Sequence, residues 1–129
     1  CDAGTEVILK DVHILLPLEE QSLDIVNMQD KIKKIAEHYG IENQSIQLME
    51  EMAELTIALN KYRRSSKVEH QTISESIDEQ FIVAQIMEEI VDVTIVLDQL
   101  KHLFNYSSDE LAIWKQRKIE RQLERIAKE

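Results

Sequence analysis

Apolar residues recur at three- and four-residue spacing over four long stretches of this chain, which is the spacing of one face of an α-helix. The first stretch covers residues 22–38 and is followed by Gly40, a residue type that commonly ends helices. The second extends to about residue 62, and Asn43 or Ser45 can cap its start. We therefore predict two helices separated at Gly40. The apolar side predicted for the second helix comprises Ile46, Met49, Met52, Ala53, Ile57 and Leu59.

A third helix is predicted from about Ile77 to Asn105, after a polar connector over residues 63–79. Its apolar residues cover well over half of the helix circumference, so either the same chain or another subunit must cover most of its sides. The sequence Ser107-Ser108-Asp109-Glu110 has the form of a capping box and predicts a fourth helix that continues to about Ile126. Helices of this length rarely cover so much apolar surface alone, so we expect a homodimer or homotetramer.

The composition agrees with this pattern. The 129 residues include only two Gly and one Pro, and residues that favour helices dominate. The predicted fold class is all-α: a helical bundle of about four helices, completed by oligomerisation. Residues 28–129 are predicted to form one helical domain, which a short N-terminal extension over residues 1–27 precedes.

The charge of the chain limits its partners. A formal net charge of -10 repels the phosphate backbone of nucleic acids and the anionic surface of membranes, so neither is an expected partner. No run approaches the roughly 20 apolar residues of a membrane span. The single cysteine, Cys1, has no second cysteine in the chain to pair with, so the predicted location is the cytoplasm.

Two acidic clusters lie within the most apolar helical stretches. They are Glu50-Glu51-Met52-Ala53-Glu54 and Glu88-Glu89-Ile90-Val91-Asp92. Carboxylates three or four residues apart share a helix face, so each cluster presents paired oxygens on one side. If the two helices pack antiparallel with these sides opposed, four carboxylates converge on one volume. Such an all-oxygen environment suits a hard divalent cation such as Mg²⁺.

Solvated surface charge is the alternative explanation for any one of these acids. Asp92 argues against it, because Asp is a poor residue inside a helix and this one is surrounded by Ile90, Val91, Val93, Ile95 and Val96. A di-iron carboxylate site would need Glu-x-x-His, and none of the four histidines has a Glu three residues before it. The two clusters together therefore predict a site for Mg²⁺, or for Mn²⁺ in its place.

The order of these motifs resembles a known family. Glu50-Glu51-x-x-Glu54, then Glu89-x-x-Asp92 on the next long helix, then the basic sequence Lys118-Ile119-Glu120-Arg121, is similar to the all-α nucleoside triphosphate pyrophosphohydrolases of the MazG-like superfamily. The resemblance covers roughly residues 28–126. It implies Mg²⁺-dependent hydrolysis of a nucleoside or deoxynucleoside triphosphate to the monophosphate and pyrophosphate, in the cleaning of nucleotide pools.

The resemblance also implies roles for individual residues. Glu51, Glu54, Glu89 and Asp92 would hold the metal, and Glu50 would orient or deprotonate the attacking water. Lys118 and Arg121 would bind the phosphates, and the candidates for base binding are His38, Gln44 and Gln47. Two other functions stay open: a phosphoribosyl-ATP pyrophosphohydrolase with the same fold, and a non-catalytic helical protein whose acidic clusters meet a basic partner.

Overall fold

A computed structural model describes residues 18–65 and 77–129, and every regular element within these ranges is a helix. The elements are α2 (Leu18–Ser65), α3 (Ile77–Leu103) and α4 (Ser108–Lys128). The all-α prediction is confirmed for this part of the chain. No helix in it combines the length and the hydropathy needed to cross a membrane. Most of the N-terminal extension, residues 1–17, and most of the predicted connector, residues 66–76, lie outside the described ranges.

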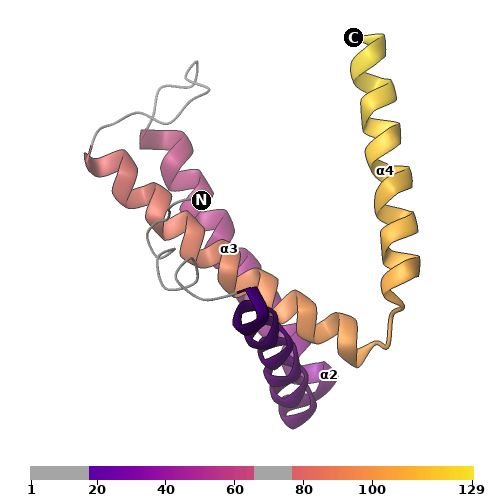
Figure 1. Cartoon of the computed structure of the whole chain (residues 1–129). Helices are drawn as coiled ribbons and strands as arrows, with labels where there is room; N and C mark the ends of the chain where they lie inside the picture. Colours follow the sequence, from indigo (N-terminus) through magenta and orange to yellow (C-terminus); the bar gives the residue numbers. More distant parts are fainter. Residues whose placement is uncertain (1–17, 66–76) are drawn as a thin grey trace.

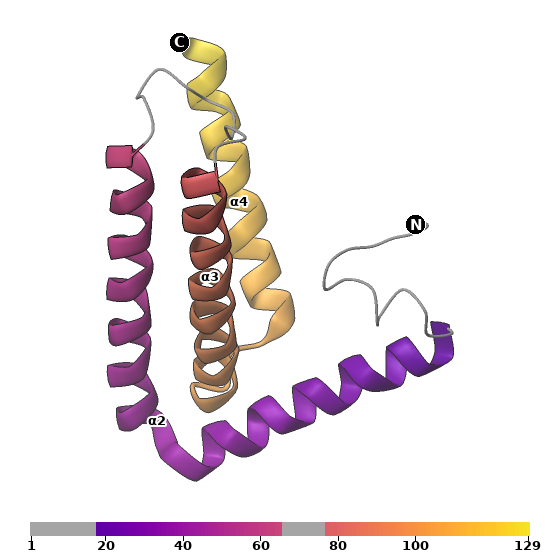
Figure 2. The same cartoon turned by 90° about the vertical axis from the view of Figure 1, so that its left-hand side faces the viewer.

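The first two predicted helices form a single bent element. Within α2, Gly40 has φ 87° and ψ 172°, a conformation outside the helical region that glycine adopts readily. Helical residues follow Gly40 at once, so a bend replaces the predicted separation. We call the part of α2 before Gly40 its first limb and the part after Gly40 its second limb. Figure 2 shows the first limb leaving the second at a steep angle. The side chain of Asn43, predicted as a cap, donates from its amide to the carbonyl oxygen of Tyr39 at 2.9 Å across this bend.

The second limb of α2 and α3 form an antiparallel pair (Figures 1 and 2). Leu48 and Ala58 of α2 and Val96 of α3 are buried, and Leu55 is half-buried. The side predicted as apolar from the sequence is not the side that packs on α3. Large apolar residues on it, including Met49 and Ile57 at 59% and 58% exposure, remain open to solvent. The prediction chose the wrong side because α2 is apolar on more than one side, so periodicity alone did not select the packed one.

The start of α4 confirms the predicted cap. The Ser107 hydroxyl oxygen accepts from the backbone N–H groups of Asp109 and Glu110 at 3.2 and 3.3 Å, which satisfies donors that a helix start otherwise leaves unpaired. Asn105, with φ 58°, turns the chain between α3 and α4. Beyond this turn α4 diverges from α3 (Figure 1) and buries none of its residues. Apart from Leu111, which is half-buried, the large apolar residues of α4 are exposed in the described chain.

Candidate functional site

Two carboxylates occupy positions on the packed sides of the helix pair. On α2, Glu51 shares its face with Leu48, Leu55 and Ala58, because these residues follow at helical spacing. On α3, Glu89 shares its face with three partly or fully buried residues, Ile86, Val93 and Val96. Both Glu51 and Glu89 are half-buried, as is Asp92. Each apolar face is therefore interrupted by an acid where the two helices meet.

The structure brings the predicted metal ligands together. Carboxylate oxygens of Glu51, Glu54 and Glu89 all lie within 4.8 Å of one another, although α2 and α3 are separated in sequence. Asp92 is near enough to act electrostatically on both Glu51 and Glu89. Glu50, the predicted base, is exposed at the position next to Glu51. We call Glu51, Glu54, Glu89 and Asp92 the carboxylate cluster.

The carboxylate cluster is electrostatically unfavourable as it stands. The pKa of Glu51 is raised by loss of solvation and by the charges of Asp92 and Glu54, while a hydrogen bond from Gln47 acts in the opposite direction. The pKa of Glu89 is raised by loss of solvation and by the charges of Asp92, Glu51 and Glu88. Like charges held this close disfavour ionisation. A cation between them would relieve the repulsion.

The donor set also limits which cation fits. All the converging atoms are carboxylate oxygens, and no histidine or cysteine of the described residues belongs to the group. Oxygen donors favour hard ions such as Mg²⁺, Ca²⁺ and Mn²⁺ over zinc or copper. Because these acids are only half-buried or exposed, water and a substrate phosphate can reach the same volume.

The predicted phosphate ligands lie elsewhere in the chain. Lys118 and Arg121 are exposed on α4, which diverges from the helix pair (Figure 1). Six cations and four carboxylates occur along α4, so this helix is basic in an otherwise acidic protein. Arg117 lies 5.6 Å from the ring centre of Trp114, a cation–π distance. A single chain does not bring the basic residues of α4 to the carboxylate cluster.

Two of the predicted base-binding residues have other partners. Gln47 donates from Nε2 to Oε2 of Glu51 at 3.3 Å, which orients that carboxylate. Gln44 is buried and donates to the side-chain oxygen of Gln99 on α3. Only His38 keeps an exposed ring, which meets Tyr39 edge-on at 4.7 Å. A hollow next to the bend of α2 is lined by Tyr39, Asn43, Gln44, Ile46 and Gln47.

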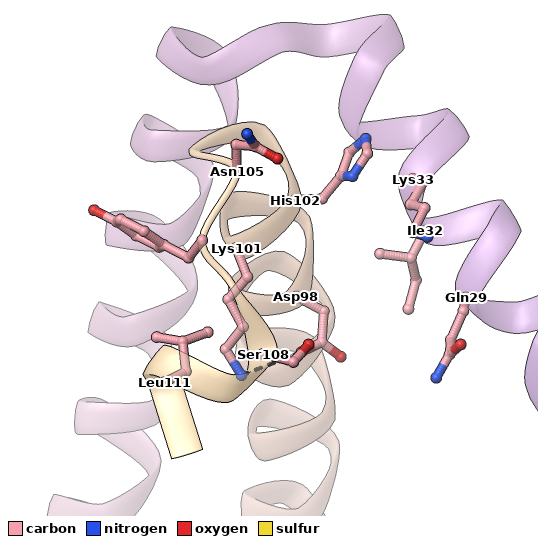
Figure 3. Close-up of a pocket in the computed structure, with 10 residues that line it drawn as sticks. Gln29, Ile32, Lys33, Asp98, Lys101, His102, Asn105, Ser108 and Leu111 are labelled. Atoms are coloured by element: carbon pink, nitrogen blue, oxygen red, sulfur yellow. Dashed lines mark ion pairs between the residues drawn. The ribbon is translucent and has the colours of Figure 1, made fainter. Parts of the chain in front are cut away.

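Sequence reasoning missed a second hollow, where α3 ends. Figure 3 shows residues of the first limb of α2, of α3 and of the start of α4 around it. Lys101 pairs with Asp98 at 3.6 Å, and Nε2 of His102 lies 2.7 Å from a carboxylate oxygen of Glu37. Lys101 follows Glu89 by twelve residues, about 18 Å along a helix, so the hollow is separate from the carboxylate cluster. The contact between Glu37 and His102 joins residues far apart in sequence and leaves no local signal.

The residues missed around the carboxylate cluster are Gln99 and, as an orienting residue, Gln47. Gln99 lies seven residues after Asp92, and that spacing was the available signal, because seven residues bring a helix back to the same side. Comparison with known proteins adds no further assignment: no family model, no curated protein and no solved structure matches this chain.

Proposed function

We propose that the protein is a Mg²⁺-dependent nucleoside triphosphate pyrophosphohydrolase. It would hydrolyse a nucleoside or deoxynucleoside triphosphate between the α and β phosphates, releasing the monophosphate and pyrophosphate, and so clean nucleotide pools. The observation that carries the proposal is the convergence of Glu51, Glu54 and Glu89 from two helices within 4.8 Å, with Asp92 beside them. The order of motifs along the chain supplies the reaction class.

The carboxylate cluster would hold Mg²⁺, or Mn²⁺ in its place. A metal bound there would neutralise charge on phosphate oxygens and lower the pKa of water. The exposed carboxylate of Glu50, next to the cluster, would accept a proton from the attacking water. Gln47 would keep one oxygen of Glu51 oriented.

Phosphate binding by Lys118 and Arg121 would need a second copy of the chain, since α4 diverges from the carboxylate cluster of its own chain. Arginine and lysine suit this role because charge-assisted contacts to phosphate oxygens are strong. The exposed apolar residues of all three helices support an oligomer. A homodimer or homotetramer could then place α4 of one copy near the carboxylate cluster of another.

The proposal is tested by incubating the protein with a panel of nucleoside triphosphates and Mg²⁺ while pyrophosphate and orthophosphate are measured separately. We expect pyrophosphate, and loss of activity by about a hundredfold or more in Glu51→Gln, because a metal ligand is removed. Glu42→Gln, an exposed acid on the same helix, is the matched control. Absence of pyrophosphate with every substrate, including phosphoribosyl-ATP, would exclude both pyrophosphohydrolase functions.

A non-catalytic helical interaction protein is the second candidate, and the extent of exposed apolar surface favours it. Thermal unfolding with increasing Mg²⁺ separates the two. A site that binds Mg²⁺ only in the folded state stabilises it by about 2.7 kcal/mol at a hundredfold excess over Kd. An interaction protein without a metal site should keep the same melting temperature.

A further inference from the structure

Two glutamines form a buried bridge between α2 and α3. Gln44 and Gln99 are 7% and 2% exposed, and the Gln44 amide donates to the side-chain oxygen of Gln99. Burying an amide is unfavourable unless it finds a hydrogen-bonding partner. The hydrogen bond between these two side chains forms only when Gln44 and Gln99 lie opposite each other.

The bridge lies one heptad from the carboxylate cluster on both helices. Glu51 follows Gln44 by seven residues, and Asp92 precedes Gln99 by seven. Because α2 and α3 run antiparallel, the same step of two helical turns, about 10.5 Å, separates the bridge from Glu51 and from Asp92. When Gln44 faces Gln99, Glu51 therefore comes close to Asp92, as their electrostatic interaction indicates.

The apolar residues of the interface do not select this alignment alone. Its buried apolar members, such as Leu48, Ala58 and Val96, are small or aliphatic, and side chains of these shapes can pack in more than one alignment. Residues 66–76 separate the helices in sequence, and the length of this segment does not by itself fix the alignment. The contact between Glu37 and His102 is largely solvent-exposed, and exposed ion pairs contribute little.

We propose that the Gln44–Gln99 bridge sets the register of α2 against α3 and thereby assembles the carboxylate cluster. A slip by one heptad would separate the two amides, would set Gln44 opposite Asp92 or Gln99 opposite Glu51, and would move Asp92 away from Glu51. Buried polar pairs specify register in this manner in coiled coils, at some cost in stability. Gln44 and Gln99 are thus positioning residues, and their consequence for metal binding rests on the function proposed above.

The test replaces the bridge by a nearly isosteric apolar pair, Gln44→Met with Gln99→Met. Spin labels at Lys61→Cys and Ala84→Cys, exposed positions on α2 and α3, report the register in a Cys1→Ser background. Labelled chains are diluted with unlabelled ones so that only distances within one chain are measured. The control is Gln85→Met, which alters a half-buried glutamine of α3 that is not in the bridge. Gln44→Leu with Gln99→Leu serves if the first pair does not fold.

We expect one distance in the control and, in the bridge variant, a second population that is longer by a few ångströms. The change is smaller than the axial slip of about 10.5 Å because the two labels lie nearly opposite each other, so the slip is perpendicular to the line that joins them. The affinity for Mn²⁺ is measured from the spin-resonance signal of free Mn²⁺, at a temperature where the bridge variant is still folded. It should fall about 10-fold to 100-fold, as it does when residues around metal ligands are changed. A single distance identical to that of the control would overturn the proposal, as would unchanged Mn²⁺ affinity in a protein with shifted distances. If the unaltered protein binds no Mn²⁺, the proposed function fails while the distances still decide the register.

Discussion

At the scale of single residues, the main feature is that acids occupy positions where aliphatic residues would stabilise the helix pair. Glu51 and Glu89 stand on the packed faces of α2 and α3, and loss of solvation and neighbouring carboxylates raise the pKa of both. Apolar residues in their place would avoid this repulsion. Such a cost in stability is typical of functional sites.

The first prediction concerns stability as a function of pH. A carboxyl group whose pKa is higher in the folded protein than in the unfolded chain binds more protons when folded, so it makes stability fall as pH rises above 4.5, the ordinary value for Glu. Without divalent cations, the melting temperature should therefore fall as pH rises above about 4.5. The decrease should be smaller in Glu51→Gln than in the control Glu42→Gln. The melting temperature is measured at each pH by circular dichroism in a buffer that contains a chelator. An equal dependence of the melting temperature on pH in the two variants would contradict the expectation.

At the scale of elements, one residue determines the form of α2. Gly40 combines positive φ with an extended ψ, a region that residues with a side chain rarely enter. Its bend sends the first limb of α2 away while the second limb stays against α3 (Figure 2). Gln44, four residues later, is thereby placed at the end of the helix pair, where it meets Gln99.

The second prediction follows from this bend. A Cβ added at Gly40 would meet no atom within 4 Å, so the cost of Gly40→Ala is that of the backbone alone. We expect a loss of about 1–3 kcal/mol in the free energy of unfolding by urea. Gly40→Asn should cost a similar amount, because asparagine tolerates positive φ only near the left-handed helical region. Rescue by asparagine would show that the bend relaxes to that conformation. Glu42→Ala, an exposed helical position nearby, is the control.

At the scale of the whole molecule, the described chain is an open arrangement with much apolar surface in solvent. Large apolar residues stay exposed on α2, α3 and α4, and α4 buries nothing. Among the described residues, the buried apolar side chains are those of Ala36, Leu48, Ala58 and Val96, which is a small core. Charge is also divided, since α4 is basic while the whole chain is strongly acidic. Both features favour association of copies.

The third prediction tests this association by sedimentation velocity. The unaltered protein should be an oligomer, and Ile57→Glu should weaken its self-association by about tenfold or more, because it would place a charge on the exposed apolar side of α2 that we expect a second copy to cover. Leu123→Glu makes the same change on α4 and shows whether that helix participates. Gln116→Glu adds a charge at another exposed site of α4 and is the control. A monomeric unaltered protein would contradict the expectation.

The sequence by itself determined the helices, the change of direction at Gly40, the cap at Ser107 and the pairing of acids on one side of each helix, because each depends on neighbours within one or two turns. Only the tertiary structure decided which side of α2 packs on α3, since both sides are apolar and local spacing cannot rank them. It also decided that Gln44 bridges to Gln99 rather than standing free for a ligand. Contacts between distant segments depend on how two whole surfaces fit, and no stretch of one helix contains that information.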